Sequence, residues 1–166
     1  MDCFEAIKTR RSVRAFSSKS LTSALLEKLI DAGRFAATAR NVQPWEFVVV
    51  TDKTVLAALG ALAENGRFIR DSAACIAVFC ADTKYYLEDG CAATQNIMVA
   101  AAAEKIGSCW VAGDKKPYAG AVSKLLSVPD KLKLVSLIAV GYPETPELLM
   151  GADKRDLKEL IHWEKY

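Results

Sequence analysis

Residues 87–105 read LEDGCAATQNIMVAAAAEK and form the least polar stretch of the chain. Between positions 92 and 103 the polar residues are Thr94, Gln95 and Asn96. A membrane-spanning helix needs ~20 apolar residues, so this stretch is too short and too polar for one. Its small side chains are typical of a helix that is buried nearly all round and closely approached by another backbone. We therefore predict a helix at the centre of the fold, or of a dimer.

Apolar runs before and after this helix indicate a sheet. Strands are predicted over residues 47–51, 73–81, 108–113 and 134–140. The first is β-branched and apolar on both faces, which favours a central strand. Further helices are predicted over residues 2–9, 22–39, 53–64 and 121–127, with Asp2, Thr22 and Asp52 as N-caps. Helices before, between and after strands indicate a layered α/β arrangement, and residues 1–166 are predicted to form a single domain.

Composition narrows the classes of partner. The chain of 166 residues is 52% hydrophobic with a mean hydropathy of +0.13, which predicts either a large core or an apolar face covered by a partner. A net charge of +2 argues against nucleic acid as the main partner, because phosphate-backbone binders are usually more basic. Residues 1–5 lack the basic start of a signal peptide, so the expected location is the cytoplasm, without membrane association.

The sulfur and imidazole side chains do not form a metal-ligand pattern. Cysteines stand at positions 3, 75, 80, 91 and 109, and His162 is the one histidine. No pair has the spacing of zinc ligands, and the mostly apolar surroundings predict buried thiols in a reducing compartment. We therefore expect no metal site.

Residues 10–14, RRSVR, place three guanidinium groups and a hydroxyl within five positions at the end of a short helix. Arginine binds phosphate bidentately, and a serine hydroxyl can complete the ring of donors. The alternative is a solvated basic patch, or the usual excess of cations at a helix C-terminus. The five residues alone leave both interpretations open.

Side chains able to catalyse a reaction unaided are not evident. No serine or cysteine lies at a spacing from His162 that is characteristic of a nucleophile and its base. Cys109 lies in a predicted strand, where a core thiol is expected. Neither a Gly-x-Ser-x-Gly motif, a dinucleotide-binding Gly-x-Gly-x-x-Gly nor a P-loop occurs. An enzyme with these residues would depend on a cofactor for its chemistry.

Four blocks of sequence together resemble the short form of the FMN-dependent nitroreductase family. They are residues 10–14 (RRSVR), 39–45 (ARNVQPW), 89–103 with Gln95 and Asn96, and 107–113 (GSCWVAG). The blocks occur in the family's order, and a strand ending in VGYP at residues 140–143 follows them. The resemblance covers nearly the full length of the chain.

The resemblance implies an α+β fold with α/β/α layers, in which helices flank a mainly antiparallel central sheet. It also implies an intertwined, obligate homodimer with FMN at the subunit interface. The implied activity is ping-pong electron transfer from NADH or NADPH, through FMN, to a small acceptor such as a nitroaromatic or a quinone. Because the cofactor carries the reaction, no catalytic side chain is expected.

Residues near both ends of the chain match family positions that hold the FMN phosphate and ribityl chain. These are Arg10, Arg11, Ser12 and Arg14, joined by Lys154 or Arg155. Positions around the flavin ring match residues in three other segments. The other subunit would donate a loop containing Thr38, Ala39, Asn41, Gln43 and Pro44. The central helix would contribute Asp89 and Ala92, and a turn under the ring would contribute Trp110, Ala112 and Gly113, with a backbone N–H for the flavin N5.

The chain departs from the family's pattern at two places. Arg40 is bulkier than the small residue usual in its loop, and it could reach a substrate or a phosphate of NAD(P)H, or simply point to solvent. The basic motif of the tail is reduced to Lys154 and Arg155. Two other functions also fit the residues: an FMN-binding carrier or redox-sensing module without turnover, and a small α/β scaffold whose arginines are only a solvated face.

Overall fold

A four-stranded sheet runs through the computed structural model, which describes residues 1–166. Its strands are β1 (Trp45–Val50), β2 (Ala74–Ala81), β3 (Gly107–Ala112) and β4 (Leu132–Gly141). They lie in the order β1-β2-β4-β3, and all three neighbouring pairs are antiparallel. The mainly antiparallel sheet implied by the family resemblance is therefore confirmed.

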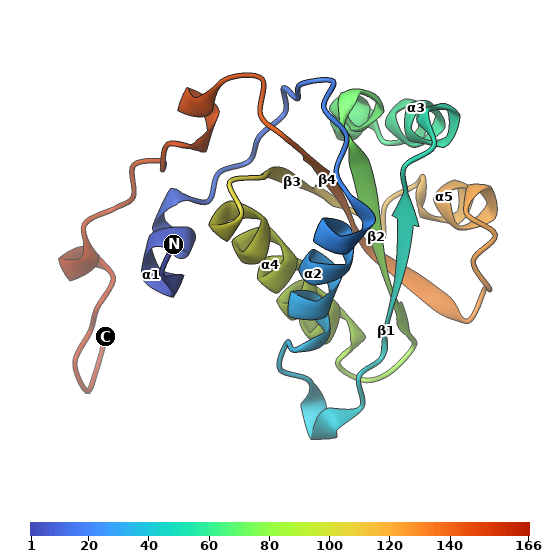
Figure 1. Cartoon of the computed structure of the whole chain (residues 1–166). Helices are drawn as coiled ribbons and strands as arrows, with labels where there is room; N and C mark the ends of the chain where they lie inside the picture. The colour runs from blue at the N-terminus through green and yellow to red at the C-terminus, as the bar shows by residue number, and fades with distance from the viewer.

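Helices cover both faces of the sheet. They are α1 (Cys3–Thr9), α2 (Ser23–Arg34), α3 (Lys53–Leu62), α4 (Tyr86–Ala103) and α5 (Ala119–Leu125). Short 3-10 segments occupy Ala39–Asn41, Glu64–Asp71, Pro146–Leu149 and Leu157–Glu159. Helices α2 and α4 lie on one face and α3 and α5 on the other (Figure 1). The result is the α/β/α layering of an α+β fold.

The predicted helix starts are confirmed by their hydrogen bonds. The side chains of Asp2, Thr22 and Asp52 each accept a hydrogen bond from a backbone N–H in the first turn of the helix that follows. Such bonds satisfy donors that have no partner within the helix, so polar residues at these three positions define where α1, α2 and α3 begin.

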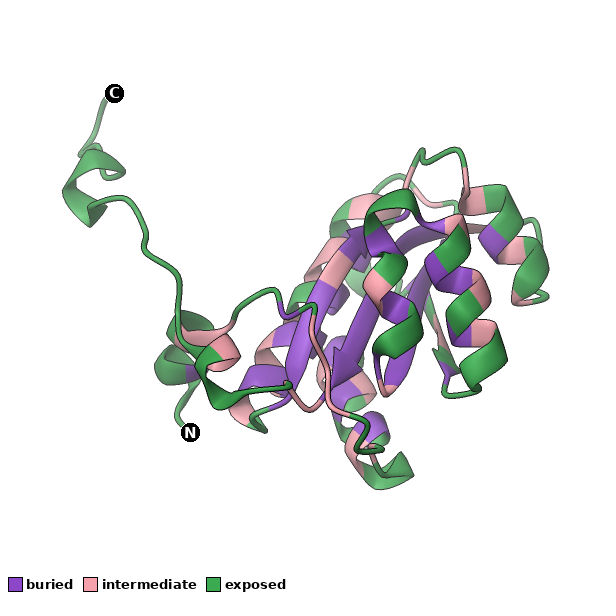
Figure 2. Cartoon of the chain, turned by 90° about the horizontal axis from the view of Figure 1, so that it is seen from above, coloured by how far each residue is buried: buried purple, intermediate pink, exposed green.

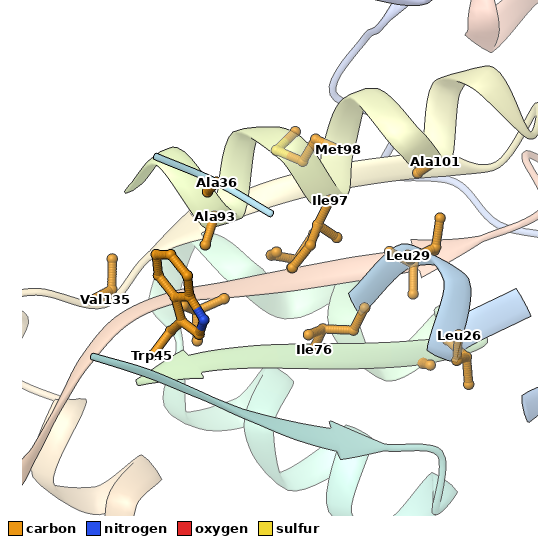
Figure 3. Packing of buried hydrophobic residues seen from close by; sticks show 14 of the residues in the cluster. Leu26, Leu29, Ala36, Trp45, Ile76, Ala93, Ile97, Met98, Ala101 and Val135 are labelled. Carbon is orange, nitrogen blue, oxygen red and sulfur yellow. The ribbon is translucent and has the colours of Figure 1, made fainter. Parts of the chain in front are cut away.

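Two hydrophobic cores lie on opposite sides of the sheet. The first packs α2 and α4 against the strands, with Leu29, Ile76 and Ile97 fully buried (Figure 3). The second lies under α3 and α5 and contains Leu56 and Phe79. Strand residues alternate between the two cores, which is why all eight positions of β2 are apolar.

Helix α4 is the centre of the first core because small residues let neighbouring elements approach it. A Cβ at Gly33 of α2 would lie 2.8 Å from Ile97, and one at Gly90 would lie 2.7 Å from Val135 of β4. The helix is less enclosed than predicted, since Gln95 is exposed and Val99 is half-buried. No helix of the structure combines the length and the apolar character needed to cross a bilayer.

Two details of the fold differ from the sequence-based prediction. Strand β1 lies at an edge of the sheet, although it was predicted to be central. Its Phe47 packs against the first core and Val48 against the second, so an edge strand between two helical layers has the same apolar pattern as a central one. Helix α2 ends at Arg34 and not at residue 39, because Thr38 is held away from the helix by a distant carboxylate described below.

The C-terminal segment differs from the rest of the chain in its burial. Every residue from 151 to 166 is exposed, including Leu157, Leu160 and Trp163 (Figure 2). This segment passes α1 and extends away from the sheet (Figure 1). Its apolar side chains therefore have no core within their own chain.

Candidate functional site

The chain after α1 runs beside the first residues of β3. The Val13 N–H donates to the carbonyl oxygen of Ser108 at 2.9 Å, and Ser12 forms a parallel bridge with Ser108. The Val13 side chain is buried against Gly107, where a Cβ would lie 2.8 Å from its Cγ1. Backbone pairing and a buried anchor thus hold residues 10–14 in an extended conformation at the edge of the sheet.

Side chains alternate in such a segment, so Arg10, Ser12 and Arg14 face the side opposite to Val13. The Arg14 guanidinium lies 5.8 Å from the ring centroid of Phe68. None of the arginines at positions 10, 11 and 14 forms an ion pair with a carboxylate, whereas the structure contains six such pairs elsewhere. Arg11 already uses one of its donors, because its Nη1 donates a hydrogen bond to the Met150 carbonyl at 3.1 Å. The segment is therefore a cationic cluster without a counter-charge.

The Cys109 thiol lies beneath this cluster. Burial raises the pKa of Cys109, and Arg14, the Ser12 hydroxyl and Arg10 act in the opposite direction. All three residues therefore act on the same thiol. Because the pKa remains raised, the thiol is protonated at neutral pH, as expected of a core cysteine rather than a nucleophile.

After Ser108, one edge of β3 has no neighbouring strand, and this free edge extends away from the arginines. The Gly113 N–H donates to the Val135 carbonyl of β4 at 2.9 Å. Backbone N–H groups point to alternate sides along an antiparallel strand. The N–H groups of Trp110 and Ala112 therefore point to the free edge, on the same side as the Ser108 carbonyl. Of the three residues predicted to offer a backbone N–H, Gly113 is already engaged. Trp110 and Ala112 are the available donors.

The loop after α2 is tied to the first turn of α4 by one carboxylate. Asp89 is buried, and it accepts hydrogen bonds from the Thr38 hydroxyl at 2.8 Å and from the Ala39 N–H at 3.1 Å. The Thr38 oxygen accepts in turn from the Gln43 N–H at 3.2 Å. Asn41 has a φ of 55°, in the left-handed region, so this loop has a defined and unusual backbone. Asp89 thus positions the loop, in addition to any contact it makes with a ligand.

The loop and the arginine cluster lie far apart in one chain. Asp89 is in the first turn of α4, while residues 10–14 contact the region just after its last turn. A helix of 18 residues is ~27 Å long. The two groups of predicted site residues are therefore not brought together within one subunit.

The remaining predicted residues are also placed. Pro44 is buried and its carbonyl accepts from the Ala81 N–H at 2.8 Å, so it anchors the loop to β2. Ala92 is half-buried, about one turn along α4 from Asp89. Lys154 and Arg155 lie in the exposed C-terminal segment, where Arg155 pairs with Glu159 at 3.4 Å. Neither forms a hydrogen bond or ion pair with residues 10–14.

The structure adds a cation that the sequence did not single out. Lys105 follows the last turn of α4 and shares with Arg10 and Arg11 a cavity of about 150 Å³. In sequence it is the last residue of the predicted helical stretch 87–105, which is an ordinary position for a cation. The cavity lining shows that it lies near Arg10 and Arg11.

The Asp89 contacts predict a loss of stability on substitution. Asp89→Ala leaves the Thr38 hydroxyl and the Ala39 N–H without their acceptor, which should lower the free energy of unfolding by about 2–3 kcal/mol. Urea denaturation measures the change. Glu88→Ala removes an exposed carboxylate from the same turn and should shift it by less than about 0.5 kcal/mol. Equal stabilities of the two variants would show that Asp89 does not hold the loop.

Comparison with known proteins gives a consistent result over the whole chain. The model of the nitroreductase family matches residues 7–75 and 81–142. A protein from Archaeoglobus fulgidus, provisionally named an NADH dehydrogenase/NAD(P)H nitroreductase, is 33% identical over 173 residues, which cover 99% of each chain.

Solved structures share the fold. A protein of the same provisional name from Bacteroides thetaiotaomicron superposes with a TM-score of 0.93 at 29% identity, covering 99% of this chain and 98% of the other. A provisionally named nitroreductase from Desulfovibrio desulfuricans, solved in complex with FMN, has a TM-score of 0.86 at 26% identity and covers 100% and 98%.

Proposed function

Because the chain belongs to the nitroreductase family, we propose that it is an FMN-dependent NAD(P)H oxidoreductase. The FMN complex of the Desulfovibrio relative supports the choice of cofactor. We further propose that the electrons pass to a small acceptor such as a nitroaromatic or a quinone, in ping-pong order. The observation that carries the proposal is the cationic cluster of residues 10–14 at the open edge of β3.

This cluster suits the phosphate end of FMN. Arg10 and Arg14 lack carboxylate partners, and Ser12 lies between them with an exposed side chain. A phosphate dianion would supply the missing counter-charge and accept from both guanidiniums and the hydroxyl. A merely solvated basic face would not need the buried Val13 anchor that fixes these residues beside β3.

The rest of the free edge suits the flavin ring. The N–H groups of Trp110 and Ala112 face outward there, and the Tyr118 hydroxyl donates to the Ala112 carbonyl and fixes the end of the strand. FMN, when bound, supplies hydride and electron transfer at its ring. The residues of the chain then hold the phosphate, orient the ring and place fixed positive charge and backbone dipoles around it, without an acid or base of their own.

A second subunit would complete the site. In one chain the arginines lie just beyond the last turn of α4, whereas the loop of residues 38–44 is tied to its first turn. We therefore propose that the loop, with Asn41 and Gln43, contacts FMN held by the other subunit of a homodimer. The positioning bonds of Asp89 would then shape a surface that acts across the interface.

Exposed apolar side chains support a dimer. Phe4 and Ile7 of α1 are 76% and 51% exposed, and Trp163 in the C-terminal segment is 81% exposed. An open groove of about 570 Å³ between α1, α2 and α4 is lined mainly by apolar residues. Exposed apolar surface of this extent is typical of an interaction face. We propose that the groove and the C-terminal segments of two copies cover one another.

Steady-state kinetics test the proposed reaction. Initial rates are measured with a quinone at several fixed concentrations of NADH or NADPH, using protein saturated with FMN. A ping-pong reaction predicts double-reciprocal plots with parallel lines. Intersecting lines would contradict the proposed order, and an absence of turnover with any quinone or nitroaromatic would favour a carrier or redox-sensing module.

Arg40 gives a prediction about specificity. Its φ of 54° is in the left-handed region, and it lines a cavity of about 190 Å³ with Lys84 and Asp89 but forms no ion pair. If the loop reaches the partner's flavin, Arg40 can form an ion pair with the 2′-phosphate of NADPH. Arg40→Ala should then lower kcat/KM for NADPH relative to NADH, by about tenfold at most because this ion pair would be exposed to solvent. The change should shrink at high salt.

The control for Arg40 is Arg34→Ala, which removes an arginine already paired with Asp31. The same kcat/KM ratio should be unchanged in that variant. If Arg40→Ala also leaves the ratio and the reduction of anionic acceptors unchanged at both salt levels, Arg40 only faces solvent.

A further inference from the structure

Lys105 has a backbone conformation that lysine seldom adopts. Its φ is 58°, in the left-handed region. The Ile106 N–H donates to the Ala101 carbonyl at 2.8 Å and the Lys105 N–H to the Ala102 carbonyl at 3.0 Å, which together form the Schellman motif that ends α4. Glycine is strongly preferred at this position because a Cβ is strained there. The chain therefore keeps a lysine where backbone geometry favours glycine.

The surroundings of Lys105 indicate what its ammonium group could do. It shares a cavity of about 150 Å³ with Arg10, Arg11 and Ser108. Lys105 forms no ion pair, and the adjacent Glu104 is engaged by Lys28 at 2.7 Å. The lining also includes four apolar residues: Met1, Ala102, Ile106 and Leu149. Three cationic residues thus line one small cavity, and no carboxylate is among its lining residues.

The helix dipole alone does not account for this arrangement. A cation is favoured near any helix C-terminus, but a lysine within the last turn would serve equally well without left-handed strain. Strained residues persist mainly where the surrounding structure uses them, often in a binding site. The position just beyond α4 is the one that places Lys105 in the lining of the cavity that Arg10 also lines.

We propose that Lys105 is an additional phosphate contact, which binds the same phosphate group of FMN as Arg10. This inference rests on the proposed function and extends its binding site by one residue. Lys105 would thus lower the stability of the chain and raise its affinity for the cofactor. Replacement by glycine should therefore change these two properties in opposite directions.

The test compares Lys105→Gly and Lys105→Arg with the wild-type protein. Dissociation constants are measured by equilibrium dialysis for FMN and for riboflavin, which has the same ring but no phosphate. Lys105→Gly should weaken FMN binding about 5- to 30-fold, the range for one charge-assisted contact at a partly exposed site, and leave riboflavin binding within about twofold. Lys105→Arg keeps the charge and should remain within about threefold of wild type for FMN.

Melting temperatures provide the second readout. FMN is held at the same multiple of each variant's dissociation constant, so that the stabilisation by bound ligand is equal in all samples. Under these conditions Lys105→Gly should melt about 1–4 °C higher than wild type, because glycine relieves the left-handed strain.

Ser127→Gly is the matched control. Ser127 has a φ of 54° and ends α5 with the same motif, since the Val128 N–H donates to the Ser123 carbonyl at 2.9 Å and the Ser127 N–H to the Lys124 carbonyl at 3.1 Å. It lies on the other face of the sheet, away from the arginines. This variant should gain a similar melting temperature without a change in FMN affinity.

Three outcomes would overturn the inference. Unchanged FMN affinity in Lys105→Gly, with a lower melting temperature, would mean that the lysine serves only the helix dipole. Equal weakening of FMN and riboflavin would mean a general distortion rather than a lost phosphate contact. If the wild-type protein itself binds no FMN, the proposed function fails, and this inference fails with it.

Discussion

Arg10→Ala and Arg14→Ala should each lower the affinity for FMN by about one to two orders of magnitude without unfolding the chain. Each substitution removes a charge-assisted contact worth about 1.5–3 kcal/mol. Arg10 is half-buried and Arg14 is exposed, and neither side chain forms a hydrogen bond or ion pair within the chain, so their removal leaves no buried polar group unsatisfied. Flavin titration of the apoprotein gives the dissociation constants, and far-ultraviolet circular dichroism checks the fold.

The control for this pair is Arg70→Ala. Arg70 is an exposed arginine that pairs with Asp71 at 3.3 Å, and its loss should leave FMN affinity unchanged. Riboflavin binding should also change little in Arg10→Ala and Arg14→Ala, because the lost contacts are to phosphate. If both variants bind FMN as tightly as the wild type, the phosphate does not lie at residues 10–14.

The second large effect concerns assembly. We expect the protein to sediment as a dimer, and its melting temperature to rise with protein concentration. Removing residues 157–166 deletes five exposed apolar side chains, those of Leu157, Leu160, Ile161, Trp163 and Tyr166. If some of them are buried against the partner, the dimer should dissociate about a hundredfold more readily, since burial of each is worth about 1.5–3 kcal/mol.

Lys165→Ala is the control for the truncation, because it changes the same segment without removing apolar area. It should leave the dimer intact. FMN should be lost together with the dimer if the loop of residues 38–44 acts across the interface. A wild-type chain that sediments as a monomer at micromolar concentration and still holds FMN would contradict both proposals.

Local patterns were sufficient to predict most of the fold. Polar residues at helix starts and apolar periodicity gave the helices and strands, and the caps formed by Asp2, Thr22 and Asp52 are all present. These features depend on neighbours within a few residues, so the sequence expresses them directly. The antiparallel arrangement came instead from the family resemblance, because strand order depends on contacts between distant segments.

Long-range contacts explain what could not be predicted. The end of α2 depends on the bond between Thr38 and Asp89, which are 51 positions apart. The edge position of β1 could not be predicted because helices cover both of its faces and give it the apolar pattern of a central strand. The role inferred for Lys105 depends on its left-handed φ and on the cavity that it shares with Arg10, and no local sequence pattern predicts either. In each case the residue can be read from the sequence, but its contacts with distant parts of the chain cannot.

In the candidate site, too, local patterns could be predicted and long-range contacts could not. The type and spacing of Arg10, Ser12 and Arg14 were compatible with an anion site or a solvated basic patch. The structure adds that Val13 anchors the segment and that no carboxylate forms an ion pair with its arginines. The proposed second subunit rests on the structure alone, because only the structure shows that the length of α4 separates the arginines from the loop of residues 38–44 in one chain.

Flavin reduction by the purified protein tests the central claim most directly. FMN is added, the excess is removed, and NADH or NADPH is introduced under anaerobic conditions while the visible absorbance of the flavin is followed. We predict a yellow protein whose colour is bleached by at least one of the two nucleotides and returns when a quinone is added. A preparation that retains no FMN, or a yellow one that neither nucleotide bleaches, would contradict the assignment as an FMN-dependent NAD(P)H oxidoreductase.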